Sequence, residues 1–295
     1  MLIAWVRLLQ FVTRTALQTG VLEDRIWQLV LKYRHHFSQM RPPLELETTF
    51  DDNVRIITSL SDHIESQVFW QGFQEADEGV VRLLKRHLPV NGIFVDIGAN
   101  VGTFTLVAAR RAPRGEVHAF EPSAHHFARL SRNVTLNRFE NVVLNQKGLY
   151  DQPGEAVLFL PSKAGEMNNS GAASLYTSGG SEVQQFSEAI ALVRLDDYVQ
   201  DRAITNLDII KIDIEGAEIR ALEGARETIA RFRPLVFMEL DRDNLARAGY
   251  SADNVLDLWN SLNYDVSVIL VTGETVSVRS SKELGPHQNL ECRPA

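Results

Sequence analysis

The sequence predicts an α/β fold in which a parallel sheet carries helices on both faces and follows an N-terminal helical extension. From residue 92 onward, apolar runs such as "GIFVDIG" alternate with amphipathic runs such as "VGTFTLVAARR". This alternation is typical of parallel strands joined by helices. The chain has 295 residues, 44% hydrophobic and 23% charged, which is enough for one sizeable domain with an appendage.

The N-terminal part is predicted to be helical as far as a proline pair. "MLIAWVRLLQFVTRTALQ" and "DRIWQLVLKYRHHF" are both amphipathic, and "RPP" then interrupts the pattern. We therefore expect a helical extension over residues 1–43, a main domain over 44–280 and a polar tail over 281–295.

Apolar spacing predicts the elements of the main domain in turn. Residues 155–160 and 190–195 are expected to pair as antiparallel strands around a polar insert, 161–189, which is long enough for a substrate lid or a binding loop. The other expected elements are strand 54–60, helix 75–88, strand 92–98, helix 101–111, strand 116–121, helix 123–137, strand 141–149, strand 207–213, helix 216–232, strand 234–240, helix 253–262, and strands 264–270 and 275–279.

Charge is distributed unevenly along the chain. Residues 1–40 carry five Lys or Arg and two acidic residues, a net +3, so the formal charge of -8 leaves -11 for the remainder. Arg7 and Arg14 break the first apolar run short of the roughly 20 residues that a membrane span needs. Two interpretations stay open, a helix packed on the protein and a helix lying on a membrane surface or a partner.

The overall composition excludes some functions. Broad nucleic-acid binding is not expected of an acidic chain, because its affinity comes mainly from Lys and Arg neutralising phosphates. The single cysteine, Cys292, allows neither a disulfide framework nor a thiolate zinc site. No secretory signal is recognisable. We expect a cytoplasmic protein, with membrane attachment through residues 1–40 as the open alternative and no prediction of oligomeric state.

The turn "DIGANVG" lies at the carboxyl end of a predicted strand, where open α/β sheets bind ligands. Gly98 and Gly102 allow the backbone to approach a ligand closely, and Glu121, one strand later, suits the two hydroxyls of a ribose. The dinucleotide pattern G-x-G-x-x-G is absent. Asp96 precedes the first glycine and would repel a phosphate but attract an ammonium group. The turn therefore favours S-adenosylmethionine over a nicotinamide dinucleotide.

The stretch "DIIKIDIEGAE" places charges in a strand that should be almost wholly apolar. Lys211, Asp213 and Glu215 alternate with isoleucines, and Glu239 ends the following strand. Charges in such places pair, bind an ion or do chemistry. One interpretation is a structural Lys–carboxylate pair. The other is that these carboxylates orient or deprotonate a methyl acceptor, with Lys211 balancing their charge. A divalent cation is a further alternative that we do not predict.

Several of these stretches together resemble FkbM-type S-adenosylmethionine-dependent methyltransferases. Between about residues 68 and 240 the chain contains "FWQGFQEADEGVVRLL", "FVDIGANVGTFT", "AFEPS", "NNSGAASL", "RLDDYV", "DIIKIDIEGAE" and "VFMEL" in the order and spacing of that family. The resemblance implies a Rossmann-like class I methyltransferase sheet of seven strands with an antiparallel hairpin at one edge. It also implies cofactor contacts at Asp96, Gly98, Asn100, Gly102 and Glu121, with Ser123 and Gly148 nearby.

The resemblance implies methyl transfer, most often to a hydroxyl on a sugar, a glycolipid or another small molecule, and in some relatives to protein. A nucleotide-dependent oxidoreductase and a noncatalytic module of the same fold remain alternatives. Residues expected to wall the acceptor are Trp70, Phe73, Asn168, Asn169 and Tyr176, because the insert is rich in groups that hydrogen-bond polyols and the aromatic rings could stack on a sugar.

Overall fold

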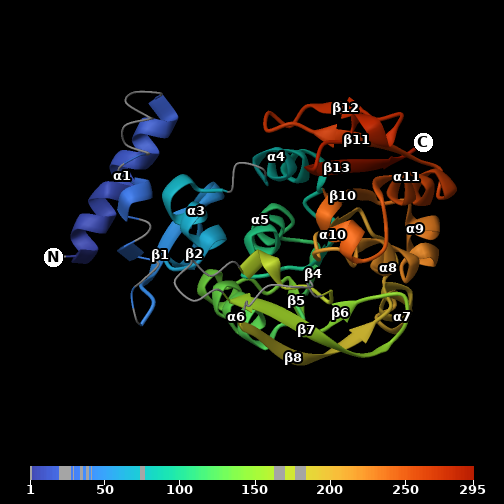
Figure 1. The fold of residues 1–295 in the computed structure, drawn as a ribbon, viewed down its shortest axis with the longest axis horizontal. Helices are drawn as coiled ribbons and strands as arrows, with labels where there is room; N and C mark the ends of the chain where they lie inside the picture. Colours follow the sequence, from blue (N-terminus) through green and yellow to red (C-terminus); the bar gives the residue numbers. More distant parts are fainter. Residues whose placement is uncertain are drawn as a thin grey trace.

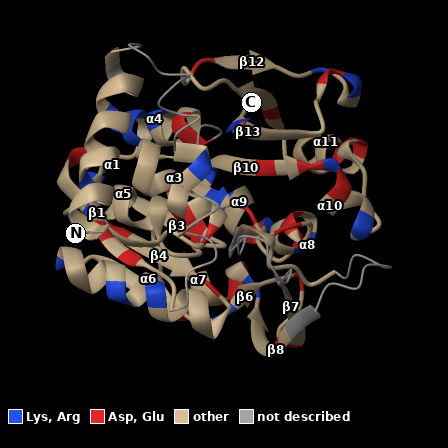
Figure 2. Cartoon of the chain, turned by 60° about the vertical axis from the view of Figure 1, so that its left-hand side comes forward, with Lys and Arg blue, Asp and Glu red and all other residues tan. Residues whose placement is uncertain are grey.

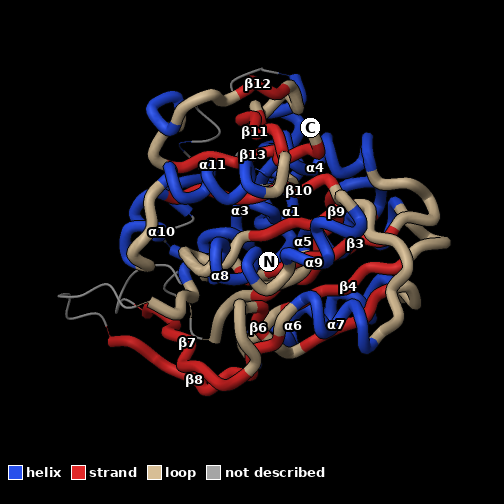
Figure 3. The backbone as a smooth tube through the Cα atoms, turned by 90° about the vertical axis from the view of Figure 1, so that its right-hand side faces the viewer, coloured by secondary structure: helices blue, strands red, loops and turns tan. Residues whose placement is uncertain are grey.

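The computed structural model describes residues 2–19, 28, 30–33, 36–37, 40, 42–73, 77–162, 170–176 and 184–295. A central sheet confirms the predicted α/β fold (Figure 1). Its eight strands have the order β12-β11-β13-β10-β9-β3-β4-β5, and Figure 3 shows most of them stacked one above another. They are β3 (Ile93–Ile97), β4 (Glu116–Phe120), β5 (Val142–Asn145), β9 (Ile209–Ile212), β10 (Leu235–Asp241), β11 (Tyr264–Ile269), β12 (Thr275–Ser277) and β13 (His287–Pro294).

The strands between β5 and β10 are all parallel, so their carboxyl ends meet at one edge of the sheet. Asp96 lies opposite Ala119 on β4 and opposite Lys211 on β9. The register therefore brings the glycine turn after β3 next to the charged end of β9, as the sequence predicted.

The predicted polar tail is wrong. Residues 287–294 form β13, which pairs antiparallel with β10 on one side and with β11 on the other. Leu290 and Cys292 are fully buried. The strand alternates these two apolar residues with polar ones, and a pattern with so few apolar members is too weak to identify from sequence. The main domain therefore continues past residue 280.

Helices cover both faces of the sheet. Each face buries the apolar side chains of its own set of helices. The predicted helix over 216–232 is instead two short helices, separated at Gly224, where a Cβ would lie 2.0 Å from the carbonyl oxygen of Tyr150. The first face carries α4 (Glu78–His87), α5 (Thr103–Arg111) and α6 (Ala124–Asn137), and the second carries α7 (Leu195–Asp201), α8 (Glu218–Glu223), α9 (Arg226–Phe232) and α11 (Ala252–Ser261).

A second sheet lies beside the carboxyl edge of the first and has the strand order β6-β8-β7. The strands are β6 (Gly148–Leu149), β7 (Gly154–Ser162) and β8 (Gln184–Val193). β7 and β8 pair antiparallel, which confirms that prediction. Of the insert between them, the described part includes the 3-10 turn η3 (Ser170–Ala172) and a bridge between Ser174 and Phe159.

The N-terminal segment packs on the protein. Helix α1 (Leu2–Thr19) lies on α3 (His63–Gln71) beside the hairpin of β1 (Glu45–Phe50) and β2 (Val54–Ser59), at the outer edge of the molecule (Figure 1). Val6 and Leu9 are buried against Phe69 and Trp70. Across the described residues, the model contains no helix with both the length and the apolar character needed to cross a membrane.

Candidate active site

The turn between β3 and α5 is held tightly between its neighbours. The amides of Gly98 and Ala99 donate to the carbonyl oxygen of Phe120, at 3.0 and 2.9 Å. Gly98 has φ +79°, and a Cβ there would lie 2.0 Å from the carbonyl oxygen of Asp213. No other residue fits this position, because both the backbone angle and the space require glycine. The turn therefore brings bare backbone against the end of β9.

Glu121, at the end of β4, is fixed by the same turn. Its Oε2 accepts from the amide of Asn100 at 2.8 Å, and its Oε1 accepts from the amide of Ser123 at 2.9 Å. The side chain is buried, and this burial raises the pKa of Glu121 to about 7, although the two amide hydrogen bonds oppose the shift. Both oxygens keep a lone pair, so the carboxylate can accept two further hydrogen bonds from a pair of hydroxyls.

Asp96 lies beneath the turn and does not line the cavity. Its Oδ2 accepts from the hydroxyl of Thr105 on α5 at 2.5 Å. Its Oδ1 is buried and has no hydrogen-bond partner among the residues that the structure describes. Burial raises the pKa of Asp96, while Lys211 and Thr105 lower it. Asp96 was expected to contact the cofactor directly. It lies beneath the turn instead, where its Oδ1 has no hydrogen-bond partner among the described residues.

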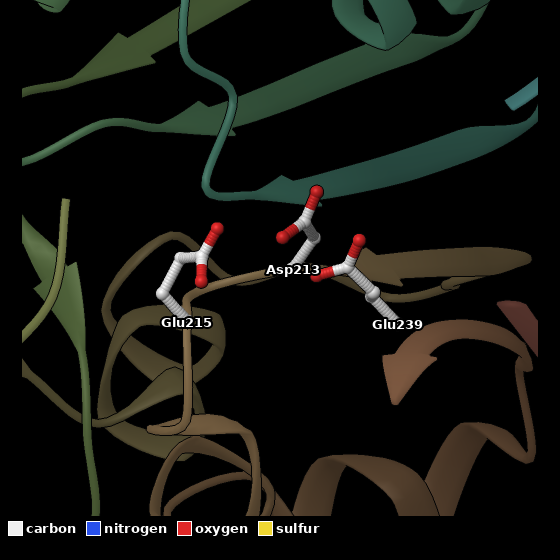
Figure 4. Close-up of side chains that lie close together, drawn as sticks. All are labelled: Asp213, Glu215 and Glu239. Carbon is white, nitrogen blue, oxygen red and sulfur yellow. The ribbon is translucent and has the colours of Figure 1, made fainter. Parts of the chain in front are cut away.

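The carboxylates of Asp213, Glu215 and Glu239 converge at the carboxyl end of the sheet, as Figure 4 shows. One oxygen of each lies within 4.8 Å of the others. Lys211 Nζ lies 3.2 Å from Asp213 Oδ2 and 4.9 Å from the centre of the Phe104 ring. The predicted cluster of charges therefore exists, and Lys211 is its internal counterion. A divalent cation would find oxygen ligands here, but the acidic groups alone do not establish a metal site.

The two glutamates of this cluster have raised pKa values. Burial, and then the charge of Asp213, raises the pKa of Glu239 well above its usual range. Burial and the same neighbour raise the pKa of Glu215 to about 8, and Asn244 donates a hydrogen bond to it. Both glutamates therefore hold a proton near neutral pH. Asp213 is the carboxylate of the three that forms an ion pair with Lys211.

Two further groups line this end of the cavity and were missed from the sequence. His287 on β13 lies 3.4 Å from Glu239 through Nε2 and 3.4 Å from Asp241 through Nδ1. Asp77 precedes α4 and is half-buried, and desolvation raises its pKa to about 7. Asp77 lies within the stretch "FWQGFQEADEGVVRLL", but nothing in that stretch pointed to it as a site residue, and His287 belongs to no recognisable motif. His287 could have been found only by predicting that β13 inserts beside β10, where Asp241 pairs with His287.

A single cavity of about 460 Å³ joins the turn to the carboxylates. It extends from Glu121 and Pro122 at one end to Asp213, Glu239 and His287 at the other. Gly102 and Ser123 lie outside its lining: Gly102 precedes α5, and Ser123 is fully buried at the start of α6. The predicted site residues that line the cavity are Gly98, Asn100, Glu121, Gly148, Lys211, Asp213, Glu215 and Glu239.

The predicted acceptor wall is partly wrong. Trp70 is fully buried beneath α1, where its ring packs on Phe69, so it cannot contact an acceptor. Phe73 packs against Phe50 and does not line the cavity. Tyr176 lies behind the lining, with its hydroxyl 3.4 Å from that of Tyr150. Asn168 and Asn169 fall outside the described residues. The insert contributes Leu175 and residues 171–173 instead.

Comparison with known proteins agrees with this geometry. The Methyltransferase FkbM domain matches residues 96–266, more than half of the chain. Methyltransferase sdnD of Sordaria araneosa is 32% identical over 48% of this chain and 63% of its own length. The 31-O-demethyl-FK506 methyltransferase FkbM of Streptomyces tacrolimicus is 31% identical over 46% of this chain and 60% of its own length. The match to these relatives thus spans less than two thirds of each.

Among solved structures, methyltransferase FkbM from Methylobacillus flagellatus KT aligns with 70% of this chain and 44% of its own, at 18% identity and a TM-score of 0.43. The domain match begins at Asp96, so it includes the glycine turn, Glu121 and the three carboxylates, and it ends before β13. The chain belongs to the FkbM methyltransferase family.

Proposed function

We propose that the protein is an S-adenosylmethionine-dependent methyltransferase whose acceptor is a hydroxyl group on a sugar, a glycolipid or another small molecule. One observation carries this proposal: a single cavity connects a ribose-type carboxylate, Glu121, with a second set of carboxylates around Asp213. A cofactor and an acceptor can therefore lie end to end, as a direct transfer between them requires.

The cofactor half of the cavity fits S-adenosylmethionine in the chemistry of its groups. Glu121 would accept hydrogen bonds from both ribose hydroxyls, since its own amide partners leave two lone pairs free. Gly98 presents only backbone to the cavity, and the absence of its Cβ makes room for the carbonyl oxygen of Asp213. Asp96 lies beneath the turn and outside the cavity lining, so it favours an ammonium over a phosphate in the cavity only through its negative charge. When bound, this cofactor supplies an activated methyl group.

Asp213 is the residue that we assign to the acceptor hydroxyl. An alcohol needs a hydrogen-bond acceptor or a base as it attacks, and Asp213 lines the cavity with its carboxylate paired to Lys211. Glu239 and Glu215 hold protons, so they orient and neutralise rather than accept. His287 lies 3.4 Å from Glu239 and is partly exposed, so it offers the released proton a route to solvent.

The acceptor half of the cavity carries further polar groups, because Asn244 donates to Glu215 and Arg247 donates to Asn244, and His63 also lines the cavity. This set of donors and acceptors suits a polyol. Two relatives have names that point the same way: the 2-O-methyltransferase NoeI of Sinorhizobium fredii, 27% identical, and the hexuronic acid methyltransferase AglP of Haloferax volcanii, 27% identical. The first name supports transfer to an oxygen, and the second supports an acceptor of the sugar-acid class.

A transfer assay with methyl-labelled S-adenosylmethionine tests the proposal. The purified protein is incubated with separated small-molecule, glycolipid and protein fractions, and labelled products are analysed for an O-methyl group. We expect label in a small-molecule or glycolipid fraction. Label confined to protein would contradict the acceptor class. Calorimetry measures the binding of S-adenosylhomocysteine and of NAD in a second experiment. Binding of NAD and not of S-adenosylhomocysteine would contradict methyl transfer and indicate an oxidoreductase.

A further inference from the structure

Helix α1 buries some of its apolar side chains against the protein and exposes others. The exposed ones lie between residues 2 and 12, in the first two thirds of the helix. The most exposed are Leu8, at 61%, and Phe11, at 69%. Single exposed apolar residues are common on protein surfaces, whereas a continuous row marks an interaction site. The row consists of Leu2, Ile3, Trp5, Leu8, Phe11 and Val12.

The polar side chains of the same helix fix this orientation. Gln10 Nε2 is buried and donates to Thr48 Oγ1 at 2.7 Å and to the carbonyl oxygen of Phe69 at 2.8 Å. Arg14 donates to the carbonyl oxygens of Val68 and Phe69 at 2.9 and 2.8 Å. Arg7 donates to that of Glu47. Rotating α1 to bury its apolar row would break all of these contacts, so the row faces outward as a built feature.

The electrostatics of the segment point to the nature of its partner. Helix α1 contains two arginines and no acidic residue. Residues 1–40 carry a net +3, whereas the other 255 residues carry -11. Figure 2 shows acidic residues on β10 and adjoining segments. An anionic surface would attract this segment and repel the rest of the chain.

The size of the row favours a lipid surface over a second protein. The row extends over residues 2 to 12, about 16 Å of helix, so a stripe about 10 Å wide covers roughly 160 Å², well below the roughly 800 Å² per partner of a standard protein interface. Binding to a bilayer has no such threshold, since it grows with buried apolar area and with attraction to anionic lipids. Trp5 adds an aromatic side chain of the kind that is enriched at membrane interfaces.

We propose that α1 docks the protein on an anionic membrane surface, lying parallel to it with Leu8, Phe11 and their neighbours among the lipids. The arginines of α1 bind carbonyl groups of the protein and hold the helix to it, so the whole domain follows the helix to the surface. Docking does not depend on the methyl acceptor, and its test requires no turnover.

Co-sedimentation of the full chain with vesicles tests the proposal. One set of vesicles contains phosphatidylcholine with phosphatidylglycerol, and the other contains phosphatidylcholine alone. We expect the protein to bind the anionic vesicles more strongly. The double variant Leu8→Glu/Phe11→Glu should lose about tenfold or more of its partition coefficient, because two inserted apolar groups are replaced by charges. Its circular dichroism and Tm should be unchanged, since both positions are exposed.

A matched control adds the same two charges elsewhere. Val157→Glu/Val276→Glu alters exposed apolar residues on β7 and β12, and it should bind vesicles as the unmodified protein does. Equal binding to both kinds of vesicle would overturn the anionic preference. Absence of vesicle binding, or equal loss in both double variants, would overturn docking through α1. Sedimentation velocity tests the alternative that the exposed face of α1 binds a second copy of the chain. A dimer of the unmodified protein that becomes monomeric in Leu8→Glu/Phe11→Glu, together with no vesicle binding, would favour that alternative over membrane docking.

Discussion

Lys211 and Asp213 form the central ion pair of the cavity, with 3.2 Å between Nζ and Oδ2. The ammonium also faces the ring of Phe104, and surrounding carboxylates raise the pKa of Lys211 despite its burial. A permanent positive charge therefore occupies the centre of the acidic cluster. It provides from the chain itself the charge balance that a bound cation would otherwise bring.

The first prediction concerns metal dependence. We expect methyl transfer to continue unchanged after EDTA treatment and dialysis, because Lys211 already compensates Asp213. The rate is measured before treatment, after it, and after adding Mg²⁺. A rate that falls with EDTA and recovers with Mg²⁺ would instead make the carboxylates of Asp213, Glu215 and Glu239 metal ligands.

Replacing Asp213 by Asn should lower kcat by about 10²- to 10⁴-fold, the range expected for loss of a general base. The Kd for S-adenosylhomocysteine should stay the same, because Glu121 rather than Asp213 is assigned to the cofactor. Asp265→Asn, at an exposed position on β11, serves as the matched control and should keep full activity. Full turnover of Asp213→Asn would remove the central role that we give this carboxylate.

His287→Ala should lower kcat and leave cofactor affinity unchanged, because His287 contacts Glu239 and Asp241 at the acceptor end of the cavity. Added imidazole should restore part of the rate, since a small base can enter a partly exposed site and carry the proton. His125→Ala, on the exposed side of α6, is the control. A loss of rate that imidazole does not change would indicate a purely structural role for His287.

Cofactor binding should depend on pH through Glu121. Burial raises the pKa of Glu121 to about 7, so the carboxylate is mostly protonated at pH 6 and mostly ionised at pH 8. Only the ionised form accepts from both ribose hydroxyls. The Kd for S-adenosylhomocysteine, measured by calorimetry, should therefore be about tenfold higher at pH 6 than at pH 8. Glu121→Gln should bind S-adenosylhomocysteine weakly at both pH 6 and pH 8. If the Kd of Glu121→Gln still changed with pH as in the unmodified protein, Glu121 would not be the titrating group.

Gly98→Ala should destabilise the protein by roughly 1–3 kcal/mol and weaken cofactor binding, because φ is +79° and the new Cβ would lie 2.0 Å from a carbonyl oxygen. Gly154→Ala is the matched control, since no atom lies within 4 Å of a Cβ built there and its φ is not in the left-handed range. Thermal melts and calorimetry measure the two effects. Equal Tm values for Gly98→Ala and Gly154→Ala would contradict the requirement for glycine at position 98.

The central sheet and its ligand edge could be predicted from the sequence because their strands are nearly continuous apolar runs. Ile209 to Ile212 is buried at every position, and Phe94 to Ile97 likewise, so both strands and the glycine turn between strand and helix could be recognised, whereas their register came only from the structure. β13 could not be predicted, because its identity as a strand comes from pairing with β10 and β11 on both sides rather than from its own composition.

Site residues could be predicted where a chemically suitable side chain directly follows a recognisable strand. Glu121 and Asp213 follow strands that end at the same edge, and parallel pairing brings them to one cavity. Trp70 shows the opposite case. The aromatic cluster before the glycine turn was expected to contact the acceptor. Trp70 is instead buried beneath α1, and this contact with a helix distant in the sequence is not visible in the local pattern. His287 was missed for the same reason, because it reaches the site through a long-range strand pairing.

The position of β13 also affects how the protein is made. β10 and β11 lie on either side of it, so neither can complete its hydrogen bonding within the sheet until residues 287–294 have left the ribosome. Until then, both strands present open edges that other chains could pair with. Synthesis therefore passes through a stage in which most of the cavity has been translated while the sheet behind it is still open, and chaperones would be most useful at that stage.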